Sequence, residues 1–237
     1  MTKYKTAIIG LGRIASTIDD EVKGSSYLLP WGHMPSYLEV PEIEVVAAAD
    51  SYAEQRETFG SRYGLSNLYA DYREMIEKER PDIVSVCTST KPRAEVVTAI
   101  AGMGTGIKAI WTEKPIATSL AEADSMVSAC RSAGIKLAIN CLRRWDPWYN
   151  KAREMIDSGA IGRIHQVNVS AFGEFSHNSH PLNLIRYLAG GNGRVSWVFG
   201  EMESDEKANS DEDLGGYGYL AFENGVRGFL RLADLES

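Results

Sequence analysis

The sequence predicts an α/β protein in two parts: a doubly wound parallel sheet of the Rossmann type, and an α+β domain with a mainly antiparallel open sheet. Three observations lead to this prediction. Short apolar segments alternate with helical segments in the first half, a glycine-rich turn follows the first apolar segment, and long alternating strands replace this pattern after about residue 140. We therefore expect two domains, over residues 1–140 and 141–237.

The first domain is expected to contain a parallel sheet with helices on both faces. Its apolar segments are short and lack polar alternation, which is typical of strands buried on both sides. These strands are predicted at 5–9, 43–49, 82–87, 107–111 and 135–140. Helices joined to them by right-handed crossovers are predicted at 53–62, 71–79, 93–101 and 119–133.

The second domain shows a different pattern, in which strands alternate polar and apolar residues. Helices are predicted at 147–158 and 182–188, and strands at 162–172, 217–222 and 226–230. Asn224-Gly225 separates the last two strands, and this dipeptide is typical of a tight hairpin. The pattern therefore predicts a mainly antiparallel sheet with helices.

The composition is that of an ordinary water-soluble protein. Of the 237 residues, 44% are hydrophobic and 24% charged, and the net charge of −7 argues against a nucleic-acid-binding surface. No apolar segment reaches the length of a membrane span. The three cysteines, Cys87, Cys130 and Cys141, are odd in number and are expected to be reduced. Because the N-terminus leads directly into the first strand, without a signal peptide, we expect a cytoplasmic protein.

The glycine-rich turn after the first strand indicates a dinucleotide site. The residues GLGRIA match the pattern G-x-G-x-x-G/A. Gly10 permits a tight turn, Gly12 lets the backbone approach a pyrophosphate, and Ala15 lets the next helix pack close to the strand. Arg13 and Ile14 would open that helix, whose N-terminus favours phosphate charge. The pattern predicts NAD or NADP as the cofactor.

An acidic residue ends the second predicted strand. Asp50 can accept hydrogen bonds from the adenosine ribose, and its alternative role is to cap the helix that follows. An expected loop from Asp19 to Trp31 accounts for the long separation between the glycine turn and Asp50. Because a carboxylate repels a 2′-phosphate, Asp50 favours NAD over NADP, although Arg56 can offset this repulsion.

A lysine follows the fourth predicted strand, at the edge where open α/β sheets bind ligands. Glu113-Lys114-Pro115 comes directly after this strand, and Pro115 makes the turn that presents Lys114 more rigid. A partly desolvated lysine beside a nicotinamide can move a hydroxyl proton while a hydride leaves the carbon. The alternative for Lys114 alone is a solvated loop lysine.

Several motifs together resemble those of the Gfo/Idh/MocA oxidoreductase family. They follow in order along almost the whole chain: Gly10-Leu11-Gly12, Val86-Cys87-Thr88-Ser89, Glu113-Lys114-Pro115, Asn140 to Pro147, and Ala160 to Ile164. Members of this family are similar to glucose-fructose oxidoreductase and inositol dehydrogenase, and pair a Rossmann domain with an open-sheet domain. The resemblance implies an enzyme that oxidises or reduces a sugar-like or polyol-like substrate with NAD(P).

The resemblance also implies roles for individual residues. Lys114 takes the place of the catalytic or cofactor-positioning lysine, and His180 that of the family histidine, a second candidate for proton transfer. Asn183 stands where a later acid is expected and would orient the substrate together with Lys114 and His180. The residues expected to line the cofactor are Gly10, Gly12, Arg13, Ile14, Asp50, Thr88, Ser89, Glu113, Lys114 and Arg144.

The segment before His180 departs from the family pattern. Ser176 stands where an aspartate is expected, and a neutral serine cannot raise the basicity of a neighbouring lysine or histidine. The alternative for His180 is a histidine at a helix N-terminus with a satisfied hydrogen bond. A site formed by Glu174, His177 and His180 has a poor zinc pattern, so no metal is expected.

The chain ends just after the last predicted strand, whereas family members usually continue. A short sheet would leave a strand edge and an apolar face exposed, so we expect a homo-oligomer that forms through the sheet of the second domain. Two alternatives to an enzyme stay open: a dinucleotide-binding regulator of the same fold without catalysis, and a structural subunit that binds no nucleotide.

Overall fold

A computed structural model describes residues 3–23, 29–172, 179–190, 194–202 and 215–233. The chain divides into two compact units, Met1–Asn140 and Cys141–Ser237. Each unit is described by itself below.

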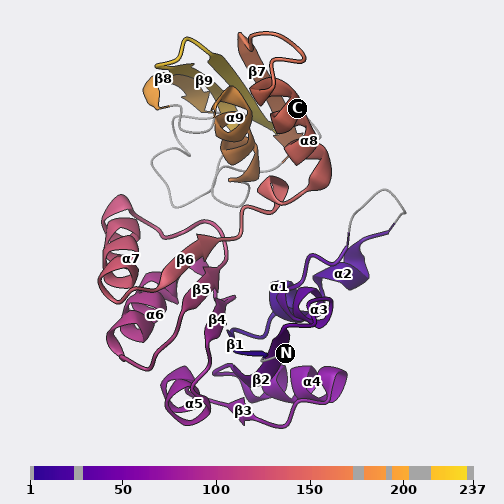
Figure 1. The fold of residues 1–237 in the computed structure, drawn as a ribbon, viewed down its shortest axis with the longest axis vertical. Coiled ribbons are helices and arrows are strands. Elements are labelled where there is room, and N and C mark those ends of the chain that lie inside the picture. The colour runs from indigo at the N-terminus through magenta and orange to yellow at the C-terminus, as the bar shows by residue number, and fades with distance from the viewer. Residues whose placement is uncertain (1–2, 24–28, 173–178, 191–193, 203–214, 234–237) are drawn as a thin grey trace. The chain divides into compact units, whose positions relative to one another are not determined.

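The first unit is built on a six-stranded parallel sheet with the order β3-β2-β1-β4-β5-β6 (Figure 1). The strands are β1 (Tyr4–Ile9), β2 (Ile43–Ala49), β3 (Leu68–Tyr69), β4 (Ile83–Val86), β5 (Ala109–Thr112) and β6 (Lys136–Ile139). This order confirms the predicted doubly wound sheet. The strand order reverses between β1 and β4, and ligands of open α/β sheets bind at such a point, beyond the carboxyl ends of the strands.

Helices cover both faces of this sheet, as the unbroken apolar strands predicted. The helices are α1 (Arg13–Ser16), α2 (Ile18–Glu21), α3 (His33–Leu38), α4 (Ala53–Tyr63), α5 (Tyr72–Glu79), α6 (Thr90–Gly102) and α7 (Leu120–Ser132). Figure 1 shows α5, α6 and α7 on one face and α1, α3 and α4 on the other. Successive residues of β1 point to opposite faces, so that Ile9 packs under the first set of helices and Ile8 under the second.

The expected loop from Asp19 to Trp31 begins in a helix, because α2 covers Ile18–Glu21. The described residues 22–23 and 29–31 lie outside helices and strands, and α3 follows before β2 begins. Asp19 Oδ1 accepts hydrogen bonds from the main-chain N–H groups of Trp31 and Gly32, at 2.8 and 3.1 Å, and so ties the two ends of this insertion together. The first residue of α3, His33, is thereby brought to the sheet, where it is completely buried.

The second unit has a four-stranded sheet with the order β7-β10-β9-β8. Its elements are η1 (Leu142–Arg144), α8 (Pro147–Asp157), β7 (Gln166–Phe172), α9 (His180–Gly190), β8 (Val195–Met202), β9 (Gly216–Phe222) and β10 (Arg227–Ala233). β9 pairs with β8 and β10 in antiparallel fashion, whereas β7 and β10 are parallel. The sheet is therefore mainly antiparallel, as predicted, and the hairpin turns at Asn224-Gly225.

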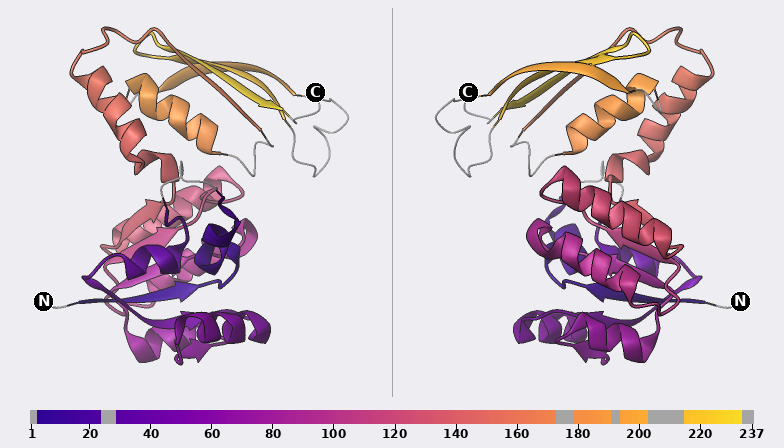
Figure 2. Two further views of the ribbon diagram at one scale, coloured as in Figure 1. Left: turned by 90° about the vertical axis from the view of Figure 1, so that its right-hand side faces the viewer. Right: turned by 90° about the vertical axis from the view of Figure 1, so that its left-hand side faces the viewer.

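The two faces of this second sheet differ in what covers them. Helix α9 packs on one face, where Ile185 joins an apolar cluster with Leu220, Phe222 and Leu230 (Figure 2). On the other face, cross-strand pairing places Phe199, Tyr219 and Phe229 in one row across β8, β9 and β10. Phe199 is 71% exposed and Phe229 39% exposed, so this aromatic row is open among the described residues.

Among the helices that the structure describes, none combines the length and the apolar character needed to cross a membrane.

Candidate functional site

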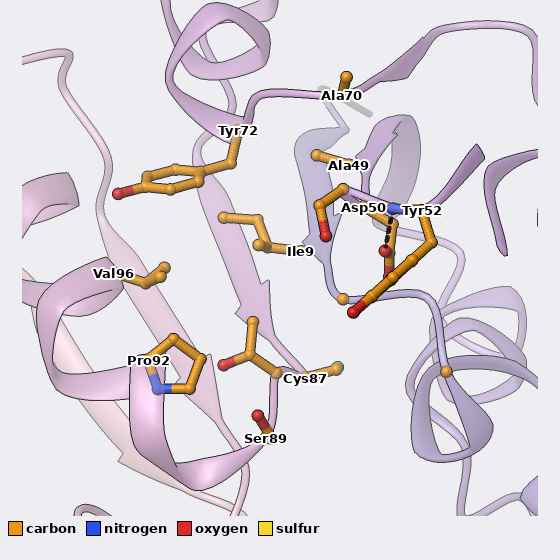
Figure 3. Close-up of a pocket in the computed structure, with 14 residues that line it drawn as sticks. Ile9, Ala49, Asp50, Tyr52, Ala70, Tyr72, Cys87, Ser89, Pro92 and Val96 are labelled. Carbon is orange, nitrogen blue, oxygen red and sulfur yellow. Dashed lines mark hydrogen bonds between the residues drawn. The ribbon is translucent and has the colours of Figure 1, made fainter.

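A pocket of about 450 Å³ lies at the carboxyl ends of β1, β2 and β4, where the strand order reverses (Figure 3). Five of the residues predicted to line a cofactor meet here: Gly10, Gly12, Asp50, Thr88 and Ser89. The other lining residues are Ile9, Ala49, Ser51, Tyr52, Ala70, Tyr72, Cys87, Pro92 and Val96. The sheet therefore collects residues from four separate segments into one site.

The two glycines of the turn differ in why the position suits a residue without a side chain. Gly10 has a φ of +84°, and a Cβ there would lie 2.8 Å from the main-chain nitrogen of Thr88. At Gly12 a Cβ would meet no atom within 4 Å. Gly10 is thus required by the fold, whereas Gly12 leaves open space beside the backbone, as a closely approaching ligand requires.

Asp50 is held on the rim of this pocket by main-chain donors. Its Oδ2 accepts from the N–H of Leu11 at 2.8 Å, and its Oδ1 accepts from the N–H of Tyr52 at 2.9 Å. The alternative role as a helix cap does not hold, because the N-cap of α4 is Tyr52. Arg56 donates to the main-chain oxygen of Asp50 at 2.7 Å, so its guanidinium lies close to Asp50.

Thr88 and Ser89 follow β4 and border the same pocket. The Thr88 hydroxyl oxygen is buried and has no hydrogen-bond partner among the described residues. A buried hydroxyl without a partner costs about 1–3 kcal/mol, so a polar group of a bound ligand would complete this position.

Arg13 and Ile14 belong to α1 and do not line the pocket. Arg13 forms a two-bond ion pair with Glu21 of α2, at 2.6 and 2.7 Å, and its side chain is largely exposed. Ile14 packs against the apolar cluster under α1, α3 and α4. Neither residue therefore shows a side-chain contribution to the pocket.

Glu113 is buried below the turn that carries Lys114 and is 6% exposed. Its Oε1 lies 3.1 Å from His33 Nε2 and accepts from Asn140 Nδ2 at 2.6 Å, while Oε2 accepts from the main-chain N–H of Lys114 at 3.2 Å. Burial by itself would raise the pKa of Glu113, but the hydrogen bonds from His33 and Asn140 outweigh it and hold the pKa below its ordinary value. Glu113 is therefore a carboxylate that anchors the Lys114 turn from inside.

A chain of hydrogen bonds continues behind His33. Because the Glu113 carboxylate can only accept, His33 Nε2 carries the proton and donates to it. Nδ1 of His33 lies 2.9 Å from the Ser85 hydroxyl, which in turn lies 2.6 Å from the Tyr37 hydroxyl. Burial raises the pKa of Tyr37, so Tyr37 keeps its proton, and the Tyr37 and Ser85 hydroxyls share a hydrogen bond behind His33.

Arg93 of α6 holds the same turn from the other face of the sheet. Its guanidinium donates to the main-chain oxygens of Thr88 and Pro115, and the residue is 2% exposed. The first oxygen lies in the loop after β4 and the second in the loop after β5. Arg93 thus joins the loop of the dinucleotide pocket to the loop of Lys114.

Sequence reasoning missed His33, Ser85, Arg93 and Asn140 as parts of this site. A signal was present, because Ser85, Glu113 and Asn140 are polar residues at or near the carboxyl ends of three adjacent strands. Such residues meet at one edge of a parallel sheet.

The second unit brings together two of the remaining predicted residues. Arg144 of η1 donates from Nε to Asn183 Oδ1 of α9 at 2.8 Å, and its guanidinium carbon lies 4.9 Å from the centre of the Tyr187 ring. His180 is the first residue of α9, one turn before Asn183. Lys114 belongs to the first unit and is placed there by the contacts of Glu113 and Arg93.

Three residues of the sequence argument, Glu174, Ser176 and His177, lie outside the described residues. The described ranges hold no cluster of three or more His, Cys, Asp or Glu side chains arranged to bind a metal ion.

The sequence is similar to those of curated sugar and inositol dehydrogenases. D-Apiose dehydrogenase of Paraburkholderia graminis is 29% identical over 189 residues, 78% of this chain and 46% of that protein. Myo-inositol 2-dehydrogenase of Thermotoga maritima is 26% identical over 186 residues, 78% of this chain and 49% of that protein. The chain thus spans about half the length of these curated relatives.

Solved structures share the fold at low sequence identity. Myo-inositol 2-dehydrogenase of Lactobacillus plantarum has a TM-score of 0.79 and 21% identity, over 98% of this chain and 70% of that chain. An oxidoreductase of Agrobacterium radiobacter, solved with NAD+, L-tartaric acid and magnesium, has a TM-score of 0.79 and 21% identity, over 97% of this chain and 66% of that chain.

Residues 4–141 match a family described as an oxidoreductase family with an NAD-binding Rossmann fold. This match covers more than half of the chain and includes β1 to β6, the glycine turn, Asp50 and Lys114. The chain therefore belongs to the Gfo/Idh/MocA family of oxidoreductases.

Proposed function

We propose that this protein is an NAD(P)-dependent dehydrogenase that transfers a hydride between nicotinamide and a sugar-like or polyol-like hydroxyl or carbonyl group. The observation that carries the proposal is the pocket beyond β1, β2 and β4, with open space at Gly12 and a fixed Asp50 carboxylate. Family membership and relatives that are named sugar and inositol dehydrogenases support it.

The polar and apolar groups that line the pocket suit the parts of a dinucleotide. The pyrophosphate would lie over Gly12, and Asp50 would accept from the ribose hydroxyls. Tyr72, Pro92 and Val96 offer an apolar wall for the adenine ring (Figure 3). Because Asp50 would repel a 2′-phosphate, NAD is the preferred cofactor, and the nearby Arg56 weakens this preference.

Lys114 is the proposed proton carrier because its turn is fixed on both sides. Glu113 binds the main-chain N–H of Lys114, and Arg93 binds the main-chain oxygen of Pro115. A lysine on a fixed turn can exchange a proton with the substrate hydroxyl while the nicotinamide takes or gives the hydride. His180 and Asn183, in the second unit, are proposed to contact the substrate.

Cofactor binding is tested by titration calorimetry with NADH and NADPH. The wild-type protein should bind NADH more tightly than NADPH, and Gly12→Val should lose most of the affinity for both. Gly102→Val is the matched control, because a Cβ at Gly102 at the end of α6 also meets no atom within 4 Å. Equal NADH binding by Gly12→Val and wild type would place the site elsewhere, and tighter NADPH binding would reverse the cofactor preference.

Catalysis is tested by following NAD(P)H absorbance with a panel of sugars, polyols and their oxidised forms. Turnover that is lost in Lys114→Ala supports the dehydrogenase. Dinucleotide binding without any turnover across the panel would favour the regulator of the same fold.

The aromatic row on the second sheet is proposed as a surface for self-association. Phe199, Tyr219 and Phe229 border a trough of about 590 Å³, and exposed apolar patches of this kind are typical of protein interfaces. Sedimentation velocity should show a dimer or larger assembly that Phe199→Glu dissociates. A wild-type monomer at micromolar concentration would contradict this surface.

A further inference from the structure

The strongest unassigned feature of the second unit is the group of side chains around Arg144. Arg144 of η1 is half-buried, and its guanidinium is oriented by two contacts with α9, the Nε bond to Asn183 and the Tyr187 ring. Tyr187 is itself fixed, because its hydroxyl donates to Asn150 Oδ1 at 2.6 Å and Arg153 binds its main-chain oxygen. The plane of the Arg144 guanidinium is therefore set before any ligand binds.

The orientation of Asn183 follows from the chemistry of arginine. Because a guanidinium has only donors, the Asn183 oxygen faces Arg144 and its amide NH₂ faces away. No described residue accepts a hydrogen bond from Nη1 or Nη2 of Arg144 or from the Asn183 amide. The Arg144 guanidinium and the Asn183 amide thus offer N–H donors that no described residue accepts.

The charge of this group is also unbalanced. No described carboxylate forms an ion pair with Arg144, since its side-chain partners are the amide of Asn183 and the ring of Tyr187. A half-buried guanidinium without a counter-ion gains from binding an anion, and its planar Nη edge matches the two oxygens of a carboxylate.

We propose that Arg144 and Asn183 form a binding site for a carboxylate group, so that the substrate is a sugar acid. This inference rests on the proposed dehydrogenase function for the substrate role, but not for the carboxylate site itself. It also differs from the sequence-based assignment of Arg144 to the cofactor, because the hydrogen bond to Asn183 joins Arg144 to the residue expected to orient the substrate.

The test compares molecules that differ in a carboxylate: gluconate with glucitol, and glucuronate with glucose. In the presence of NAD(H), gluconate should raise the melting temperature of the wild-type protein and glucitol should not. Where turnover is found, kcat/KM for the acid should exceed that for the neutral partner at least tenfold. Arg144→Gln should lower kcat/KM for the acid roughly tenfold to hundredfold, through KM, as expected for the loss of hydrogen bonds to a charged group.

Three further variants separate recognition from folding. Arg143→Gln removes the same charge from the neighbouring residue of η1 and should change kcat/KM for the acid less than twofold. Arg144→Lys keeps the charge without the planar edge and should lie between wild type and Arg144→Gln. Asn183→Asp supplies Arg144 with its own carboxylate and should weaken gluconate binding without loss of NADH affinity.

The outcomes separate the two proposals. Equal use of acids and neutral partners, with Arg144→Gln behaving like Arg143→Gln, would overturn the carboxylate site and leave the dehydrogenase standing. Stabilisation by gluconate that requires Arg144, without any turnover, would support the carboxylate site and contradict the dehydrogenase. Neither binding nor turnover of any acid, with turnover of neutral sugars, would also overturn the carboxylate site.

Discussion

Asn140→Asp should make the free energy of unfolding depend on pH, because Asn140 contacts the Glu113 carboxylate that anchors the Lys114 turn. The substitution exchanges one NH₂ group for an oxygen, and that oxygen would face Glu113 Oε1 at the present Nδ2 distance of 2.6 Å. Both residues are buried, with Asn140 4% and Glu113 6% exposed, so water screens the two carboxylates very little. Two carboxylates at this distance cannot both ionise, and the pair must bind a proton.

The cost of that proton sets the size of the effect. About three pH units separate neutral pH from the ordinary Asp pKa of ~3.9, and each unit corresponds to ~1.4 kcal/mol. Asn140→Asp should therefore be destabilised by up to ~4 kcal/mol at pH 7. Once protonated, the new carboxyl donates to Glu113 as the amide did, so that little other cost is expected.

The sign of the pH dependence follows from proton binding. The raised pKa of the pair means that the folded variant holds one proton more than the unfolded chain between pH 5 and 7, so its stability falls as pH rises, by ~1.4 kcal/mol per unit. In the wild-type protein the pKa of Glu113 is lowered, so its contribution is complete above the ordinary pKa and is lost only as the pH falls through the folded value. The difference between the two proteins should therefore shrink toward pH 5.

Urea unfolding at pH 5, 6 and 7 measures this difference. Gln55→Glu is the control, because it makes the same exchange of amide for acid at an exposed position of α4 and should show no such slope. A destabilisation of Asn140→Asp that is constant over this pH range would refute the shared proton, and with it the placement of Asn140 against Glu113.

Three further outcomes follow from the site. Lys114→Ala should lower kcat by roughly 10²- to 10⁴-fold at saturating NADH, with a nearly unchanged urea midpoint, because only the positioned side chain is lost. Full turnover would exclude Lys114 as the proton carrier. Arg93→Met should lower the free energy of unfolding in urea by about 2 kcal/mol, because two buried main-chain oxygens lose a charged donor, and it should also lower turnover. An unchanged free energy of unfolding together with unchanged turnover would exclude the bridge between the loops. Gly10→Ala should lower the melting temperature, because the added Cβ clashes with Thr88. Gly12→Ala should leave the melting temperature unchanged and lower the NADH affinity measured by calorimetry. The reverse pattern would contradict the assignment of the two glycines.

Local patterns were sufficient to predict five of the six strands of the first sheet, and only the two-residue β3 (Leu68–Tyr69) was missed. β2 occupies the predicted residues 43–49, and β4 (Ile83–Val86) lies within the predicted 82–87, because unbroken apolar segments mark strands that are buried on both faces. The hairpin of β9 and β10 was predicted equally well, because Asn224-Gly225 dictates the turn and the residues on either side alternate.

The elements that the sequence did not reveal depend on context. All but one residue of β8 (Val195–Met202) are exposed, so this edge strand has no buried side for an alternating pattern to mark. Helix α3 (His33–Leu38) has six residues, one of them a proline, and is placed by the burial of His33 and Tyr37 against β4 and β5. Neither element carries a local signal strong enough to predict it.

The candidate site divides in the same way. The meeting of Gly10, Gly12 and Asp50 in one pocket could be predicted, because the glycines form the turn after β1 and Asp50 directly follows β2. The anchors of Lys114 were not, because Glu113 is joined to His33 across 80 residues and to Asn140 across 27. Pairings over such distances depend on which strands become neighbours, and no single segment of the sequence carries that information.

The order of strands explains why these anchors converge on one turn. β5 lies between β4 and β6, so the turn after β5 is flanked by Ser85 near the end of β4 and by Asn140 just after β6. Helices on opposite faces of the sheet then supply His33 and Arg93. The Lys114 turn is thus held by both neighbouring strands and from both faces, and its geometry exists only when the whole sheet has formed. Substitutions of these anchors should therefore change stability and turnover together, whereas substitution of Lys114 should change turnover alone.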